Sequence, residues 1–219
     1  MMKTLFKHII FDLDGTLSDS REGIFNAYYS TFEKLNIKSP DKELLMTLIG
    51  PPLQKGLADV FGLKGAENEN AVKLFREYYA SKGLFENRLY DGIKELLEKL
   101  SLAGASLYVA TLKYNLYANQ VLKYFGIAQY FTEISGADYS RYHASKVDLI
   151  AGLLRRNGIQ DPSEVVIIGD TIYDIEAAAE LAIDSIGVTY GFSSVAEISS
   201  FDPDYIAYDV NDLQRLLLI

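Results

Sequence analysis

An apolar segment that ends in two aspartates and a glycine constrains this chain more than any other stretch. It occupies residues 8–16 and reads HIIFDLDGT. Because side chains on a strand alternate between its faces, Asp12 and Asp14 lie on the same side. Two carboxylates so close repel each other unless a cation or a proton lies between them, and Gly15 lets the backbone approach a ligand closely. The stretch favours chemistry near a metal ion; the alternative interpretation is a buried strand that ends in a solvated acidic turn.

The composition indicates a soluble intracellular protein. The 219 residues suffice for one large domain or a domain with a smaller insert, and 49% are hydrophobic, so a large core can be buried. The net charge of −9 argues against nucleic acid or an anionic membrane as a partner. The absence of cysteine excludes disulfides and thiolate chemistry. No apolar run approaches the roughly 18 residues of a membrane span, and too few residues precede the first strand for a signal peptide, so we expect a cytoplasmic location.

Apolar periodicity divides the chain into an all-helical block and an alternating part. Between residues 18 and 85 we predict four helical segments and no strand: 20–36, one that begins with Ser39 as its cap, 53–61 and 67–82. Beyond residue 91, helices at 92–102, 116–125, 146–156, 172–181 and 211–218 alternate with strands at 106–110, 131–135, 165–168, 183–188 and 205–207. This alternation predicts an α/β protein with a parallel sheet covered on both faces.

We therefore expect a Rossmann-like core formed by residues 1–17 and 88–219, with an inserted α-helical cap at residues 18–87. In open parallel sheets, ligands bind at the carboxyl ends of the strands. The residues that the sequence places there, or one helical turn beyond, are Asp12, Asp14, Thr111, Asp170 and Asp174, while Lys146 begins the helix before the strand that leads to Asp170.

The chemistry of this set fits phosphoryl transfer. A phosphoester is anionic, so a carboxylate attacks it only where positive charge is supplied. Mg²⁺ prefers carboxylate and carbonyl oxygens, and a lysine and a hydroxyl can hold the remaining phosphoryl oxygens. A second acid beside the nucleophile can protonate the leaving oxygen and later activate water. Singly, Asp170 could cap a helix, Thr111 could occupy a turn and Lys146 could be a solvated lysine; the ordered set favours the functional interpretation.

The stretches 11–17 (FDLDGTL) and 169–174 (GDTIYD), with Thr111 and Lys146, resemble the four motifs of the haloacid dehalogenase superfamily of phosphatases. The set is most similar to the phosphoglycolate phosphatase branch, and the helical block resembles that superfamily's cap. The second motif departs from the family pattern, because Leu112 stands where relatives often have asparagine. The third lacks the usual Lys-Pro, which leaves Lys113 as an alternative for part of the role of Lys146.

The resemblance implies a role for each matched residue. Asp12 would be the nucleophile and a metal ligand, and Asp14 the general acid and base whose backbone carbonyl also faces the metal. Thr111 would bind the phosphoryl group and Lys146 would neutralise charge. The predicted metal ligands are Asp12, Asp14, Asp170 and Asp174, the last supporting the metal's water shell. The predicted substrate-binding residues are Thr16, Gly50, Pro51, Thr111 and Lys113.

The resemblance implies Mg²⁺-dependent hydrolysis of a small soluble phosphomonoester through an aspartyl-phosphate. Phosphoglycolate, a sugar phosphate or a nucleotide would be the substrate, and the protein would be a monomer or homodimer. Two alternatives stay open. One is a phosphosugar mutase on the same fold, and the other is a non-enzymatic protein, either like a phosphoaspartate receiver domain or a scaffold.

Overall fold

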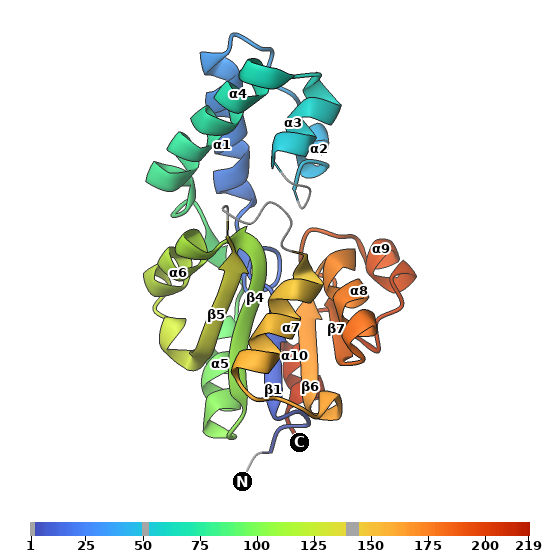
Figure 1. Cartoon of the computed structure of the whole chain (residues 1–219). Coiled ribbons are helices and arrows are strands. Elements are labelled where there is room, and N and C mark those ends of the chain that lie inside the picture. Colours follow the sequence, from blue (N-terminus) through green and yellow to red (C-terminus); the bar gives the residue numbers. More distant parts are fainter. Residues whose placement is uncertain (1–2, 50–52, 139–144) are drawn as a thin grey trace. The chain divides into compact units, whose positions relative to one another are not determined.

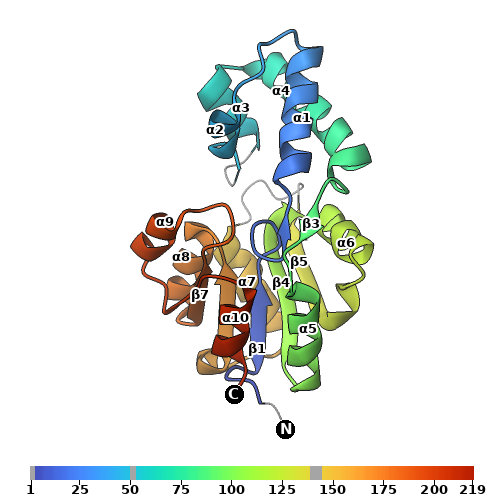
Figure 2. The ribbon, with the colours of Figure 1, turned by 180° about the vertical axis from the view of Figure 1, so that it is seen from behind.

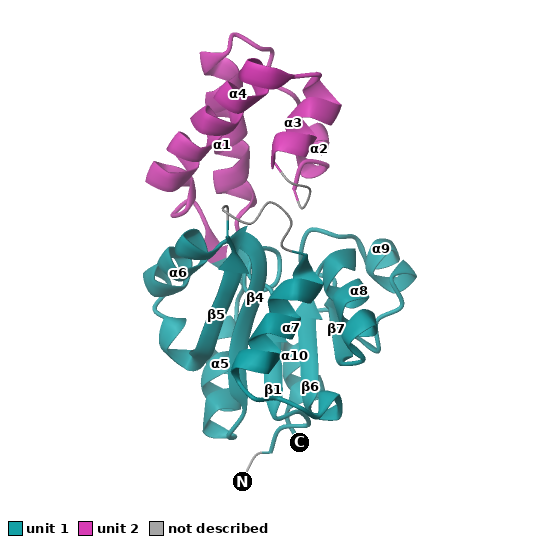
Figure 3. Cartoon of the chain, in the orientation of Figure 1, with its two compact units in different colours: residues 1–19, 89–219 teal, residues 20–88 magenta. Residues whose placement is uncertain are grey.

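The computed structural model of the chain describes residues 3–49, 53–138 and 145–219. Gly50 and Pro51, predicted to contact substrate, lie outside the described residues. The chain divides into two compact units (Figure 3): unit 1 comprises Met1–Asp19 and Leu89–Ile219, and unit 2 comprises Ser20–Arg88. No helix in the described part of the chain is long and apolar enough to cross a membrane.

Unit 1 is built on a six-stranded parallel sheet with the order β5-β4-β1-β6-β7-β8. The strands are β1 (His8–Phe11), β4 (Ser106–Tyr114), β5 (Phe131–Ala137), β6 (Val165–Gly169), β7 (Asp184–Val188) and β8 (Tyr205–Ala207). The central strands are continuous apolar runs because both faces of the sheet are covered. The chain moves outward from β1 in both directions, so the switch in strand order lies at the carboxyl end of β1, where ligands bind in such sheets.

Helices cover both faces of this sheet (Figures 1 and 2). The helices α7 (Lys146–Arg156) and α8 (Ile172–Leu181) pack on one face, and α5 (Ile93–Leu102) and α10 (Val210–Leu217) pack on the other. The remaining elements are α6 (Asn115–Tyr124), α9 (Val195–Ser200) and the 3-10 turns η2 (Ala128–Tyr130) and η3 (Pro162–Glu164). One core cluster joins alternate strand residues, such as Ile10 and Ile167, to Ile150 of α7 and Ala177 of α8. Asp12 continues the alternation of Ile10, so its side chain leans toward α7 and α8.

The α/β fold and the parallel sheet are confirmed, with some differences in element bounds. The strand predicted to end at residue 110 continues as β4 to Tyr114, with a register shift against β5 between Thr111 and Tyr114. Thr111 therefore lies within an irregular strand end rather than after it. The strand was predicted to end where its apolar run stops, at Ala110, but Thr111 still pairs with Gly136 of β5 and Tyr114 with Ala137. Helix α9 was not predicted because its six residues, VAEISS, are too few to show a helical periodicity.

The elements that the structure describes in unit 2 before residue 88 are helical: α1 (Arg21–Lys34), α2 (Lys42–Met46), α3 (Leu53–Phe61) and α4 (Gly65–Tyr78), which continues into a π-helical turn, η1 (Tyr79–Gly83). Aromatic rings form its core, since Tyr28 contacts Phe75 with ring centroids 4.8 Å apart and Phe32 contacts Phe61 at 4.5 Å. The prediction that Ser39 caps the second helix is wrong. Asp41 caps α2, and its carboxylate accepts a hydrogen bond from the N–H of Leu44.

Short backbone pairings mark the places where the chain changes unit and where it ends. Strand β2 (Ser18–Asp19), which was not predicted, pairs with β3 (Arg88–Leu89). At the two ends, the N–H of Lys3 donates to the carbonyl of Ile219 (3.1 Å), and the N–H of Ile219 donates to the carbonyl of Lys3 (2.9 Å). The two ends of the described chain therefore lie side by side in unit 1 (Figures 1 and 2).

Candidate active site

The turn after β1, residues 12–18, is folded around the carbonyl of Leu13, which accepts hydrogen bonds from the N–H groups of Thr16, Leu17 and Ser18. We call these residues the catalytic turn. Gly15 has a φ of +83°, and a Cβ at this position would lie 2.1 Å from Oδ2 of Asp170. Glycine is thus required here both by the backbone conformation and by the close approach of β6's end.

Lys146 is a buried cation at the first residue of α7, with a side chain that is 4% exposed. Its Nζ lies 2.9 Å from Oδ1 of Asp12 and 2.7 Å from Oδ1 of Asp174. Burial acts to lower the pKa of Lys146, but the charges of Asp12 and Asp174 outweigh this and raise the pKa above its ordinary value. The lysine therefore stays protonated, and the alternative interpretation of a solvated lysine is wrong.

Asp170 and Asp174 follow β6 and take different positions. Thr171 caps α8 in a capping box, in which Oδ2 of Asp174 accepts hydrogen bonds from the N–H (3.3 Å) and hydroxyl (2.8 Å) of Thr171. The interpretation of Asp170 as the helix cap is therefore wrong. Instead, Asp170 turns toward the catalytic turn, where its Oδ1 accepts from the hydroxyl of Thr16 (3.2 Å).

Three buried carboxylates converge at this edge of the sheet. One oxygen each from Asp12, Asp170 and Asp174 lies within 4.8 Å of the others. Burial raises the pKa of Asp12 to about 6, with the charge of Asp174 adding to the shift and Lys146 opposing it. Burial, and then repulsion from Asp12, raises the pKa of Asp170 well above its ordinary value. A hard divalent cation would relieve this repulsion, and its preferred ligands are such oxygens, so the donor set fits a metal site.

Asp14 has a different partner from Asp12. Both of its carboxylate oxygens accept hydrogen bonds from Nζ of Lys113, at 3.0 Å and 2.8 Å. Its carboxylate is not part of the acidic triad formed by described residues, although it was predicted as a metal ligand through its backbone carbonyl. Lys113 and Lys146 thus contact different aspartates of the catalytic turn, Asp14 and Asp12 respectively.

Thr111 lies on β4, next to β1 in the sheet. Phe11 pairs with Val109, so Thr111 lies two residues beyond the last paired position, alongside the start of the catalytic turn. It is buried, and its hydroxyl accepts a hydrogen bond from the N–H of Lys113 (3.2 Å). The structure therefore brings these residues to the same edge of the sheet in three sets of contacts. Lys113 contacts Asp14 and Thr111, Lys146 contacts Asp12 and Asp174, and Thr16 contacts Asp170.

Comparison with known proteins identifies the family. Residues 9–188 match the family described as haloacid dehalogenase-like hydrolases. The chain belongs to this family. It is 36% identical over 212 residues to a 5'-nucleotidase of Pseudomonas aeruginosa, which covers 97% of this chain and 96% of that protein. It is 30% identical over 227 residues to a phosphoglycolate phosphatase of Vibrio vulnificus, covering 100% and 99% of the two chains.

A solved structure of protein tyrosine kinase A from Mycobacterium tuberculosis resembles the whole of this haloacid dehalogenase-like hydrolase. It superposes with a TM-score of 0.81 at 33% identity, covering 96% of this chain and 97% of that one. The predicted family and its fold are thus confirmed. The alternatives of a receiver domain or a scaffold lose their support, because the 5'-nucleotidase and the phosphoglycolate phosphatase carry enzyme names and match this chain over 96% and 99% of their length.

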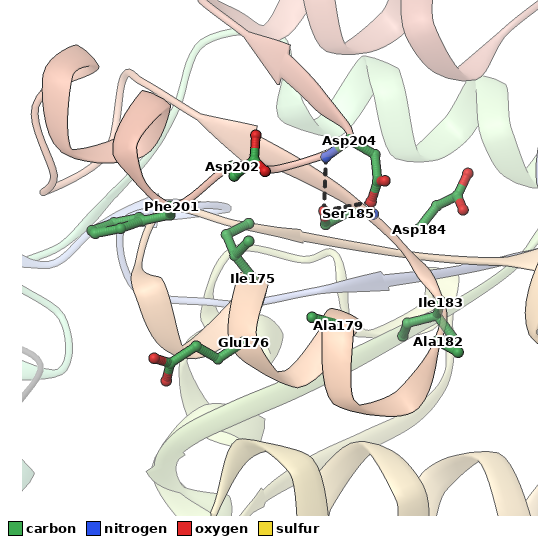
Figure 4. A pocket seen from close by; sticks show the side chains of 10 residues that line it. All are labelled: Ile175, Glu176, Ala179, Ala182, Ile183, Asp184, Ser185, Phe201, Asp202 and Asp204. Atoms are coloured by element: carbon green, nitrogen blue, oxygen red, sulfur yellow. Dashed lines mark hydrogen bonds between the residues drawn. The ribbon is translucent and has the colours of Figure 1, made fainter.

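A pocket elsewhere in this hydrolase does not belong to the site. It has a volume of about 500 Å³, lies beside α8 and β7, and includes none of the predicted site residues in its lining (Figure 4). One of its acids, Asp204, accepts hydrogen bonds from the N–H and hydroxyl of Ser185, each at 2.8 Å. That carboxylate therefore fastens the start of β7 to the segment before β8.

One segment that contacts the site, the loop after β7, was not predicted from the sequence motifs. The N–H of Phe192 donates to Oδ2 of Asp170 (2.8 Å), and the hydroxyl of Tyr190 donates to the carbonyl of Thr16 (3.2 Å). The available signal was the glycine at residue 191, three residues after the end of a strand whose carboxyl end lies at the same edge of the sheet. Tyr190 contacts Thr16, which lies more than 150 residues earlier in the sequence, so no local sequence pattern could show this contact.

Proposed function

We propose that this hydrolase cleaves small phosphomonoesters with Mg²⁺ as its metal, through a phosphoaspartate formed on Asp12. The observation that carries the proposal is the buried ammonium of Lys146, which contacts Asp12 and Asp174 within the acidic triad. A carboxylate needs neighbouring positive charge to attack an anionic phosphate, and this arrangement supplies one fixed cation and the ligands for a second. The relatives named 5'-nucleotidase and phosphoglycolate phosphatase support the same reaction class.

Asp12, Asp170 and Asp174 would hold the Mg²⁺, with the backbone carbonyl of Asp14 as a further ligand. The bound ion would neutralise the phosphoryl oxygens. Within the chain, Lys146 favours the ionised form of Asp12 and orients its carboxylate, and the hydroxyl of Thr111 is available to the phosphoryl group. We keep residues 1–17 and 88–219 as the catalytic core and assign to the cap, residues 18–87, the choice of leaving group.

Two carboxylates divide the chemical steps. The Asp12 carboxylate attacks phosphorus while the ester P–O bond breaks, and Asp14 donates a proton to the leaving alcohol oxygen. Asp14 then accepts a proton from water as the water attacks phosphorus, which releases inorganic phosphate and restores Asp12. The contacts from Lys113 to both oxygens of Asp14 hold that carboxylate in place between the two steps.

The test is phosphate release from nucleoside monophosphates, phosphoglycolate and sugar phosphates, measured with Mg²⁺ and with a chelator. We expect release only with the metal, and Asp12→Asn should lower kcat by about 10⁴-fold while leaving the fold intact, because the nucleophile is lost. Near-normal turnover by Asp12→Asn would contradict the phosphoaspartate.

A second candidate is phosphoryl transfer to a protein tyrosine, favoured by the likeness to protein tyrosine kinase A. The two differ in the acceptor, which is water in the first and a tyrosine hydroxyl in the second. Label transfer from γ-labelled ATP to protein, without release of phosphate from any ester, would select the second candidate. Isomer formation from a phosphosugar, again without release, would select the mutase.

A further inference from the structure

The four residues after β7, Thr189 to Phe192, form a loop that is fixed at its base. We call residues 189–192 the clamp loop. The N–H of Thr189 donates to the carbonyl of Ala207 in β8 (3.0 Å), which continues the parallel ladder beyond the end of β7. The loop therefore leaves the sheet from a held position, so contacts at its far end are made by a supported segment.

Each of the next three residues contacts the catalytic turn or Asp170. The Tyr190 hydroxyl donates to the carbonyl of Thr16 (3.2 Å), and the Phe192 N–H donates to Oδ2 of Asp170 (2.8 Å). Between them, a Cβ on Gly191 would lie 2.4 Å from the carbonyl oxygen of Gly15 and 2.5 Å from Oδ2 of Asp170. The backbone of the clamp loop thus packs directly on both, and no side chain fits at residue 191.

These contacts account for both oxygens of the Asp170 carboxylate. Oδ2 accepts from the clamp loop itself, and Oδ1 accepts from the hydroxyl of Thr16 (3.2 Å), whose own carbonyl is held by Tyr190. Asp170 is buried at the end of β6 beside Asp12, and burial and that neighbouring charge both oppose its ionised form. Its orientation therefore depends on the two donors, and both donors depend on the clamp loop.

The stretch that leaves the catalytic turn is held a second time. The ring of Tyr190 packs edge-on against Tyr90, with centroids 4.8 Å apart, and the N–H of Tyr90 donates to the carbonyl of Leu17 (3.2 Å). Successive carbonyls, those of Thr16 and Leu17, are thus each bound by a residue of the same tyrosine pair. All of these residues belong to unit 1.

We propose that the clamp loop is the positioning segment of the active site, in which Tyr190 and Gly191 fix the catalytic turn and Asp170 without touching the substrate. The inference rests on the proposed function for its kinetic consequence. Groups that hydrogen-bond to a metal-ligating carboxylate orient that carboxylate. The loss of such a group lowers metal affinity or activity by about 10–100-fold. The structural consequence, a rigid catalytic turn, is independent of which reaction the site performs.

The test replaces Tyr190 with Phe, which keeps the ring against Tyr90 and removes only the hydroxyl. We expect kcat to fall about tenfold with KM changed less than twofold, because substrate contacts stay while the reacting groups lose their alignment. In metal-free protein, amide hydrogen exchange of Thr16, Leu17 and Ser18 should speed up, since these N–H groups report the catalytic turn directly.

The matched control is Tyr108→Phe. Tyr108 is a buried tyrosine of β4 whose hydroxyl lies 3.3 Å from Nδ1 of His8, at the start of β1 and so at the opposite end of the strand from the catalytic turn. Like Tyr190→Phe, the Tyr108→Phe variant loses a tyrosine hydroxyl together with a contact of similar length. We expect wild-type kcat and wild-type exchange of residues 16–18 in this variant. Gly191→Ala adds a Cβ that pushes the Gly15 carbonyl and the Asp170 carboxylate away from the clamp loop, so it should lower kcat more than Tyr190→Phe does.

Three results would overturn the inference. Unchanged exchange of residues 16–18 in Tyr190→Phe would show that the hydroxyl does not fix the turn. Faster exchange with normal kcat would show that fixing it is without consequence, and equal effects from Tyr108→Phe would show a general loss of stability. If wild type releases no phosphate from any ester, the proposed function fails, while the exchange comparison and the Mg²⁺ affinity by calorimetry still decide the clamp loop's role.

Discussion

Lys146 is the residue on which the charge balance of the site depends. We expect Lys146→Ala to lower the free energy of unfolding in metal-free buffer by about 3–5 kcal/mol, because it leaves two buried carboxylates without their cation. With Mg²⁺, kcat should fall by about 10²–10³-fold. Urea denaturation and steady-state kinetics measure the two effects.

Lys7→Ala is the matched control for that prediction. Lys7 also pairs with a carboxylate, that of Glu164, but its side chain is 70% exposed. Exposed pairs contribute about 0–1 kcal/mol, so this variant should unfold near the wild-type urea concentration. A Lys146→Ala protein as stable as Lys7→Ala would contradict the electrostatic role of Lys146.

The raised pKa of Asp12 leads to a prediction of how metal binding depends on pH. Its pKa is raised to about 6 by burial, so without metal its contribution to stability is full below its unfolded value, near 4, and is lost as the pH rises through about 6. A divalent cation removes the repulsion that the ionised form creates. We expect the increase in Tm on adding Mg²⁺ to grow between pH 5 and pH 7.5. Scanning calorimetry measures this increase in Tm, and Asp12→Asn should make it depend less on pH. An equal increase in Tm at both pH values would contradict the prediction.

Most residues of the site could be predicted because each follows a strand or begins a helix. Asp12, Asp14 and Asp170 are found by the edges of apolar runs, which are local patterns. Lys146 by itself looks like a solvated lysine; its place in the ordered set, at the start of the helix before β6, and the family resemblance singled it out. Which aspartate each lysine pairs with depends on the register between β1 and β4 and on where α7 begins, and Tyr190 reaches Thr16 across the sheet. All of these features depend on the tertiary structure, so no local sequence pattern shows them.

At the scale of elements, the junction between β6 and α8 is the tightest part of the site. A Cβ on Gly169, the last residue of β6, would lie 2.0 Å from Cγ of Asp174 in the first turn of α8. We expect Gly169→Ala to cost about 1–3 kcal/mol in stability through overpacking and to reduce turnover strongly, because it displaces Asp174 from Lys146. Urea denaturation and kcat measure the two effects.

Gly158 offers the comparison for Gly169. It ends the turn after α7, has a φ of +66°, and has no atom within 4 Å of an added Cβ. Gly158→Ala should cost about 1 kcal/mol through backbone strain alone and leave kcat unchanged. If the two variants lost activity equally, the close contact between Gly169 and Asp174 would not be the reason for the loss.

Element boundaries were harder to predict than element types. The helix predicted at 67–82 is present, but it begins at Gly65 and its last turn, Tyr79–Gly83, is π-helical. There, a Cβ on Gly23 of α1 would lie 2.0 Å from the carbonyl oxygen of Gly83, so the two segments pack backbone to backbone. Hydrophobic periodicity marks the buried face of a helix, while such contacts decide how its end is wound.

At the scale of the whole molecule, the change in periodicity predicts a change of architecture, since a chain that shifts from helices alone to alternating elements cannot continue the same packing. The pairing of strands β2 and β3, where the chain passes between the two units, could not be predicted. Two-residue strands such as β2 and β3 have no periodicity, and the partner of residues 18–19 lies about 70 residues away in the sequence.

The adjacency of the two chain ends makes this protein a candidate for circular permutation. Lys3 and Ile219 already exchange two backbone hydrogen bonds, so a short flexible linker can join them without distorting the sheet. Opening the chain instead at Gly104, in the exposed turn before β4 and at the sheet edge away from the catalytic turn, should keep Mg²⁺-dependent turnover within about threefold of wild type. Opening it between Gly191 and Phe192 should abolish turnover, although both permuted chains contain the same residues. The order in which the residues are joined would then matter only where the backbone itself holds the site together.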